Sequence, residues 1–279
     1  MFLKSTLFAL IILIGCSNIA NAQDTTSNKK SSYFKLATSY LTNAVYNGRK
    51  DSVTLPYITP SIGYYDKSGF YVSGLLSYLA ATSDSRIDLF TVETGYDFTI
   101  NDKLSGGIYG SKYFYNTSST AVRSQTKGGL GANLSYDPGI VSVSGGIDLS
   151  FASKTDVNVS AALAHGFYYG EKGNEWGITP TISTNLGTQN SYQDYVKKRK
   201  SKGSGSSTVQ TNNTSNFGIL DYELSLPITY DGNKWGLFLT PTYAIPQNSI
   251  SVAASTGSGY TTEKLENTFY AQFGVYVKF

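Results

Sequence analysis

The chain of 279 residues contains one cysteine, one histidine and one methionine, and only 15% of its residues are charged. A single cysteine excludes a disulfide-stapled scaffold, and a single histidine leaves no Cys/His cluster for a zinc site. Aromatic residues make up 14%, including 23 tyrosines, and there are 28 glycines. This composition disfavours helical and disordered chains. We therefore expect one large all-β domain.

Residues 1–22 have the features of a secretory signal peptide. Lys4 lies near the start, an apolar run covers 7–14, and a small-x-small Ala-Asn-Ala sequence ends the segment. The apolar run is too short to cross a membrane as a helix. We expect the mature chain to begin at Gln23 with a short polar periplasmic lead over 23–32.

The same segment has a second interpretation. Leu13-Ile14-Gly15-Cys16 resembles a bacterial lipobox. In that case Cys16 would be acylated as the first residue instead of being removed.

The region 33–279 consists of stretches of about ten residues in which apolar and polar side chains alternate, which is the β-strand signal. This pattern predicts a single antiparallel up-and-down β-barrel. The twelve expected strands cover 33–43, 54–65, 70–80, 86–99, 104–115, 127–137, 140–152, 157–169, 176–186, 217–230, 235–245 and 265–279.

Short and long connections alternate between these strands. The short ones are 66–69, 101–103, 137–139, 170–174 and 231–234. The others, mostly longer, are 44–53, 81–85, 116–126, 187–216 and 246–264, with 153–156 as a short exception. This sorting is typical of transmembrane barrels, which have short periplasmic turns and long external loops. Both termini are then periplasmic, which requires an even number of strands.

Strand faces indicate which side chains meet lipid. Over 217–230, the face from Leu220 to Tyr230 is apolar, whereas Asp221 and Glu223 share the polar face. A transmembrane barrel turns its apolar face to lipid and its polar face to the lumen. Aromatic residues beside the short turns, expected to form an interfacial girdle, are Phe70, Trp176, Tyr230 and Trp235.

The last strand ends with Gln272, Gly274, Val277 and Phe279 in a polar–Gly–apolar–aromatic order. This order resembles the C-terminal signal of Gram-negative outer-membrane β-barrel proteins. The resemblance covers eight residues and identifies no subfamily. It implies an integral outer-membrane location and recognition by the barrel-assembly machinery.

The expected lumen combines acids, tyrosines and small residues. Acids on inward faces are Glu93, Asp148, Asp221, Glu223 and Glu266, and inward tyrosines are Tyr57, Tyr71, Tyr109 and Tyr113. Such acids favour cations over anions. Alternatively, they accept hydrogen bonds from neighbouring tyrosines or pair with a loop lysine. Small inward residues over 129–164 leave space either for solutes or for an inward-folded loop.

The longest connection, 187–216, carries the basic residues Lys197, Lys198, Arg199, Lys200 and Lys202. On an outer surface, the nearest anions are phosphates of lipopolysaccharide, and we expect these basic side chains to form ion pairs with them. The alternatives are a solvated loop or a loop that folds inward and constricts the pore. The run lacks the folded context expected of a nucleic-acid site.

The only histidine in the sequence, His165, lacks the neighbouring residues that outer-membrane enzymes place beside their catalytic histidine. The outer-membrane phospholipase carries a serine two positions after its histidine, where this chain has Phe167. Omptin-type proteases carry an aspartate two positions before it, where this chain has Leu163. We expect no catalytic residue, metal or cofactor.

Together these features predict a passive, porin-like channel for small hydrophilic solutes. The alternative is a closed barrel whose surface loops serve adhesion or envelope interaction. An enzyme that acts on lipids is the third possibility.

Overall fold

The computed structural model describes residues 31–50, 54–81, 84–171, 173–192, 211–212, 214–249, 251–253, 260–262 and 264–279. The segment expected to be a signal peptide, residues 23–30 of the expected lead 23–32, and the basic run 197–202 lie outside these residues. None of the described residues forms a helix long and apolar enough to cross a membrane.

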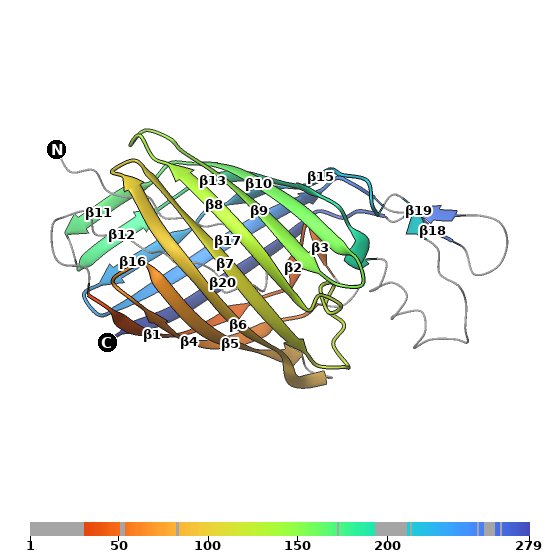
Figure 1. The fold of residues 1–279 in the computed structure, drawn as a ribbon, viewed down its shortest axis with the longest axis horizontal. Coiled ribbons are helices and arrows are strands. Elements are labelled where there is room, and N and C mark those ends of the chain that lie inside the picture. Colours follow the sequence, from red (N-terminus) through yellow and green to blue (C-terminus); the bar gives the residue numbers. More distant parts are fainter. Residues whose placement is uncertain are drawn as a thin grey trace.

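The described strands form a closed antiparallel barrel of twelve strands (Figure 1). Going round the ring, these are β1 (Tyr33–Leu41), β4 (Tyr57–Tyr65), β5 (Phe70–Ala81), β6 (Asp84–Asn101), β7 (Leu104–Tyr115), β8 (Gly128–Tyr136), β9 (Ser142–Phe151), β10 (Thr155–Ala164), β13 (Thr181–Gly187), β15 (Gly218–Ser225), β17 (Trp235–Pro246) and β20 (Thr268–Lys278). Pairing of β20 with both β1 and β17 closes the ring, so that Val277 lies opposite Leu36 on one side and Trp235 on the other.

Three of the twelve strands are interrupted near the short turns. β10 continues as β11 (Phe167–Glu171), β13 is preceded by β12 (Asn174–Ile178), and β15 continues as β16 (Ile228–Gly232). Pro180 and Pro227 lie at two of these interruptions, where proline lacks the N–H that a ladder needs. The chain stays paired across the gap, because the Thr179 N–H donates to the Pro227 carbonyl at 2.9 Å.

The predicted strand order and parity are confirmed, apart from Glu266, which is described below, and two differences in the wall. The connection expected over 81–85 is tight, because β5 ends at Ala81 and β6 begins at Asp84. Leu220, expected on the lipid face, is fully buried. The pairing of β13 with β15 shifts between Asn185 and Leu186, so one residue of β15 has no opposite partner and the strict alternation fails there.

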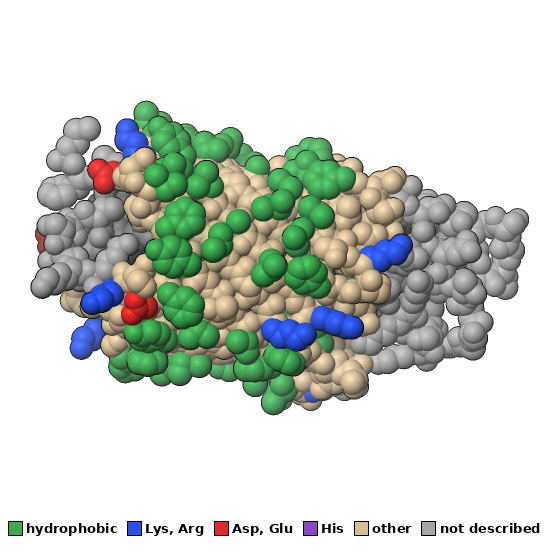
Figure 2. Space-filling view, in the orientation of Figure 1, with side chains coloured by type: hydrophobic (Ala, Val, Ile, Leu, Met, Phe, Trp, Pro, Cys, Tyr) green, Lys and Arg blue, Asp and Glu red, His purple; other side chains and the backbone are tan. Residues whose placement is uncertain are grey.

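The barrel is apolar outside and polar inside. Exposed large side chains such as Leu36, Ile62 and Leu130 cover the outer wall, and Figure 2 shows apolar side chains over much of one face. Buried side chains on the opposite strand faces include Glu93, Asp221 and many serines and threonines. This inverted distribution is that of a transmembrane barrel of the outer-membrane type.

The aromatic girdle lies where the sequence predicts it. The Tyr230 ring lies 5.1 Å from Trp176 and 5.0 Å from Trp235, between centroids, and both tryptophans are exposed. Phe70 is also exposed at the start of β5. We call the barrel end with these short turns the inner end, and the end with the long connections the outer end.

Short strands occur at the outer end. The ribbon of β2 (Val45–Tyr46) and β3 (Arg49–Lys50) lies within the barrel outline, whereas β18 (Ser251–Ala253) and β19 (Tyr260–Thr262) project beyond it (Figure 1). β14 (Thr211–Asn212) pairs with β18 to complete the projecting sheet.

Candidate functional site

The lumen wall holds the predicted acids in hydrogen-bonded positions. Glu93 is buried and accepts hydrogen bonds from the Tyr71 hydroxyl at 3.0 Å and from the Ser111 hydroxyl at 2.8 Å. Tyr109 donates from β7 to the Asp148 carboxylate on β9, two strands away. These contacts match the alternative in which tyrosines hold the acids.

A second acidic pair lies across the barrel on β15. The Asn185 side chain donates to Asp221 at 2.7 Å, and the Tyr270 hydroxyl donates to Glu223 at 3.1 Å. Both carboxylates are buried on the inward face. Any effect of Glu93, Asp148, Asp221 and Glu223 on ion selectivity stays a prediction.

Glu266 does not belong to this set, contrary to expectation. β20 begins at Thr268, so Glu266 lies in the preceding connection, where its exposed carboxylate is 3.7 Å from the Lys50 ammonium. The period-two spacing of side chains continues by chance from β20 into the preceding connection, so it does not mark where the strand begins.

Two connections fill the outer half of the lumen. We call residues 42–50, 54–56 and 116–126 the outer plug. Its apolar part joins the strand residues at the outer ends of β1, β4, β5, β17 and β20. The buried members of this cluster are Leu41, Ala44, Val45, Leu55, Tyr57, Leu79, Ala121, Ala244 and Tyr270.

The first plug segment reaches the far wall. Asn158 of β10 bonds to Asn47 and to the Tyr46 hydroxyl, each at 3.2 Å, although β10 lies across the ring from β1. Gly48 has a φ of +73°, and a Cβ added there would lie 2.9 Å from the Cβ of Asp221. A glycine is therefore required both by the backbone conformation and by the close approach.

Basic side chains fix the plug to its surroundings. Arg49 donates to the Asn248 carbonyl and lies 5.3 Å from the Tyr192 ring centroid. The buried Arg123 guanidinium lies between the rings of Tyr46, at 4.7 Å, and Tyr113, at 5.0 Å. Such cation–π contacts link the two plug segments to each other and to β7.

The second plug segment is held by a buried carboxylate on β6. Asp88 accepts hydrogen bonds from Tyr57 at 2.5 Å, from Ser119 at 2.7 Å and from Arg86 at 2.8 Å. Ser119 belongs to the plug, whereas Tyr57 and Arg86 belong to the wall. One carboxylate therefore connects the plug to two neighbouring parts of the barrel.

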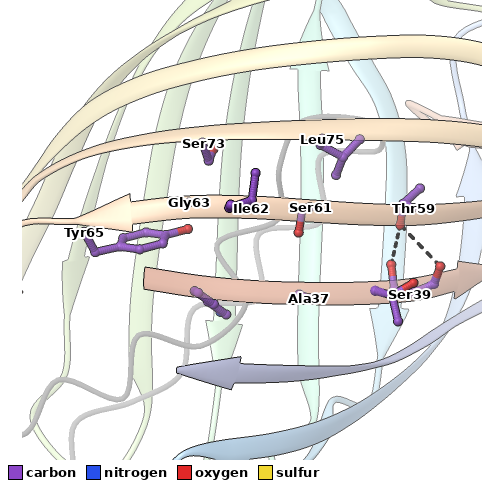
Figure 3. A pocket seen from close by; sticks show the side chains of 11 residues that line it. Ala37, Ser39, Thr59, Ser61, Ile62, Gly63, Tyr65, Ser73 and Leu75 are labelled. Carbon is purple, nitrogen blue, oxygen red and sulfur yellow. Dashed lines mark hydrogen bonds between the residues drawn. The ribbon is translucent and has the colours of Figure 1, made fainter. Parts of the chain in front are cut away.

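The inner half of the lumen has a recess in the wall of β1, β4 and β5 (Figure 3). Its empty volume is about 460 Å³, including space open to solvent. The floor is made of small side chains, namely Ala37, Ser39, Ser61, Gly63 and Ser73. Tyr65 borders the recess and stacks between Tyr33 and Tyr71, with centroids 5.1 and 5.6 Å away. Lys35, Ile62 and Leu75 also line the recess, which therefore combines polar and apolar side chains with an aromatic edge.

The residues of the proposed assembly signal lie in the closing strand. Gln272 donates to the Ser39 hydroxyl at 2.9 Å, and a Cβ added at Gly274 would lie 2.5 Å from the Thr38 carbonyl oxygen. Phe279 is exposed beside β1, and its N–H donates to the Phe34 carbonyl of that strand. Recognition of Val277 and Phe279 by the assembly machinery stays a prediction.

His165 lies at the interruption between β10 and β11. Its Nδ1 bonds to the Ile140 carbonyl, and its ring packs edge-on against Phe167 at 4.5 Å. Within the described ranges, no group of three or more His, Cys, Asp or Glu side chains could hold a metal ion.

The sequence analysis did not identify the plug residues Arg49 and Arg123, nor the wall residue Asp88 that holds the plug. Arg49 and Arg123 lie in connections, where alternation carries no information about direction. Asp88 lies within an expected strand. Arg86, two residues earlier on the same strand face, was the sequence signal that could have indicated a buried ion pair.

No family model matches the chain, and no curated protein matches it. Among solved structures it is similar to a "KdgM porin" at 10% identity and a TM-score of 0.48, over 88% of this chain and 99% of that one. A "NanC porin" is 10% identical with a TM-score of 0.46, over 88% of this chain and 98% of that one. A "bacterial polysaccharide outer membrane secretin" is 10% identical with a TM-score of 0.37, over 90% of this chain and 99% of that one. Because these TM-scores are below 0.5, the barrel assignment rests on the strand pairing of this chain itself.

Proposed function

We propose that this protein is a passive outer-membrane channel for small hydrophilic solutes, with the outer plug as its constriction. The observation that carries the proposal is the polar lumen, whose inner half retains a recess open to solvent and lined by small side chains. Serine hydroxyls on its floor and the Tyr65 edge can contact uncharged polar solutes by hydrogen bonding and stacking.

The plug sets the size of the conduit in this proposal. Its attachment to the far wall uses a few polar contacts, such as those of Asn47 and Tyr46 with Asn158. Individual contacts of this kind contribute about 1 kcal/mol each. Local displacement of the plug would therefore widen the lumen without unfolding the barrel.

A closed barrel with interacting surface loops is the second candidate. The buried apolar cluster around Leu55 and Ala121 favours it, since this cluster seals part of the outer half. No catalytic function is proposed, because the sole histidine bonds a backbone carbonyl and packs on Phe167.

Conductance across a planar bilayer tests the proposal. We compare the wild-type protein with a variant in which a short Gly-Ser linker replaces residues 43–55. The wild type should give small discrete steps, and the variant should give steps several-fold larger. A linker of the same length replacing residues 198–210, in the longest connection, is the matched control and should leave the steps unchanged.

Correct folding of each variant is checked by the difference in gel mobility between boiled and unboiled samples. A bilayer that stays sealed at high doses of both the wild type and the plug variant would overturn the channel assignment. Equal step sizes in these two proteins would instead show that the plug is not the constriction.

A further inference from the structure

Three lysines lie at the outer ends of adjacent strands. Lys112 of β7 lies opposite Gly128 of β8 in the register. Lys127 immediately precedes Gly128, and its N–H donates to the Phe151 carbonyl of β9 at 2.7 Å. Lys154 lies in the turn between β9 and β10. The backbone thus places the three residues along one arc of the outer rim, which we call the lysine arc.

The lysine arc is exposed and forms no ion pair with an acidic side chain in the part of the chain that the structure describes. All three side chains are exposed, and none belongs to the ion pairs of the described residues, which join Arg86 to Asp88 and Lys50 and Lys264 to Glu266. Asp156, close to Lys154 in sequence, is buried and accepts hydrogen bonds from Thr188, Asn190 and Ser191. Figure 2 shows basic side chains without acidic neighbours at the outer end of this face.

The inner rim has a different charge pattern. Among the described residues, its exposed turn lysines are Lys67, Lys103 and Lys234, and each of these turns also contains an acid: Asp66, Asp102 or Asp231. Positive charge is therefore locally balanced at the inner rim and unbalanced along the lysine arc. An unbalanced arc attracts anions.

Apolar side chains lie beside the arc on the lipid-facing side. Lys112 alternates with the buried Ser111 and Tyr113, so its side chain is on the outward face of β7. Exposed Phe114 shares that face and stacks on Phe90 at 6.0 Å. A lysine on the lipid side is tolerated only where its ammonium reaches the headgroup region. The outer wall thus places cations above a surface suited to acyl chains.

We infer that Lys112, Lys127 and Lys154 form a binding site for the phosphate groups of an anionic, acylated lipid of the outer leaflet. The ammonium groups would pair with the phosphates, and Phe90 and Phe114 would contact the acyl chains. The site differs from the run 197–202 that the sequence suggested for lipopolysaccharide phosphates. It does not depend on whether the lumen conducts.

The test measures how much bisphosphorylated lipid A stays with the purified, folded protein after washing in zwitterionic detergent. Changing all three lysines to glutamine should reduce retention about a hundredfold, since each lysine near an anionic lipid contributes a several-fold increase in binding. Lys67→Gln, Lys103→Gln and Lys234→Gln together form a control with the same charge change at the inner rim. This control, and the triple arginine variant of the arc, should retain lipid A as the wild type does.

Dephosphorylated lipid A should be retained about a hundredfold less by the wild type, because all three lysines lose their phosphate partners. Wild-type retention by the triple glutamine variant would overturn the site, as would an equal loss in the inner-rim control. Displacement of lipid A by inorganic phosphate alone would overturn the assignment to a lipid. If the triple glutamine variant fails to fold, Lys154→Gln in the exposed turn replaces it, and unchanged retention there counts against the site.

Discussion

The outer and inner halves of the lumen are built from the same strands with the same inward parity, yet they differ in what fills them. In the outer half, the plug packs Leu55 and Ala121 against wall residues. In the inner half, small residues such as Ser61 and Gly63 border an open recess. Alternation therefore decides the polarity of a lumen wall, whereas the connections decide whether the space inside is occupied.

Buried carboxylates in the two halves also differ in their partners. Asp88 in the outer half is 2.8 Å from the Arg86 guanidinium and also accepts from Ser119 of the plug. Glu93, further toward the inner end on the same strand, accepts from the hydroxyls of Tyr71 and Ser111. The charged partner and the plug contact make Asp88 part of a tertiary connection, whereas Glu93 connects only neighbouring wall strands.

The largest effect is expected for Asp88→Ala. This change removes the acceptor of three side-chain hydrogen bonds and the carboxylate of a buried ion pair. Breaking a buried pair by removing one partner costs about 3 kcal/mol or more. We expect the free energy of unfolding, measured by urea titration of the refolded protein, to fall by that amount.

Asp102→Ala in an exposed inner turn is the control for Asp88→Ala and should change the free energy of unfolding by less than about 0.5 kcal/mol. Channel steps of the Asp88 variant should also fluctuate more, because Ser119 loses its acceptor. Equal stability losses in the two variants would show that Asp88 does not hold the plug.

Glu93→Gln should have a smaller effect. Tyr71 and Ser111 donate to different oxygens of the Glu93 carboxylate, so the amide oxygen keeps one of these two bonds and the amide N–H must donate to the other hydroxyl instead. The side-chain volume is nearly unchanged. Replacing charge-assisted by neutral hydrogen bonds lowers the free energy of unfolding by about 1 kcal/mol. If Glu93 also affects ion passage, the ratio of cation to anion permeability in a bilayer falls. A loss as large as that of Asp88→Ala would remove the distinction between the two halves.

The wall was predictable from the sequence because its signals are local. Alternation over 140–152 and the short turns place strands and faces without knowledge of distant residues. The plug was not predictable, because the positions of Gly48 and Arg123 in the lumen depend on contacts of the plug with β10, β15 and β7, which are distant in the sequence. Leu220 was misplaced for a similar reason, since the bulge beside it exists only in the pairing of β15 with β13.

The smallest effect is expected at Asp66, outside the membrane-spanning strands. Hydrogen bonds from Ser68, then from Ser32 and Tyr64, hold the pKa of this carboxyl well below its usual range. A lowered folded-state pKa stabilises the protein above the ordinary aspartate value of about 3.9, and this contribution is lost as the pH falls below it.

Asp66→Asn should therefore weaken the dependence of the unfolding free energy on pH below about 4. Asp102→Asn, in another short inner turn, is the matched control. The measurement is urea unfolding at several pH values between neutral and strongly acidic. Because the inner turn lies far from the plug, the Asp66 variant should keep the channel step size of the wild type. A changed step size would mean that the inner turns and the outer plug are coupled through the barrel wall, and the two halves could then no longer be treated as independent.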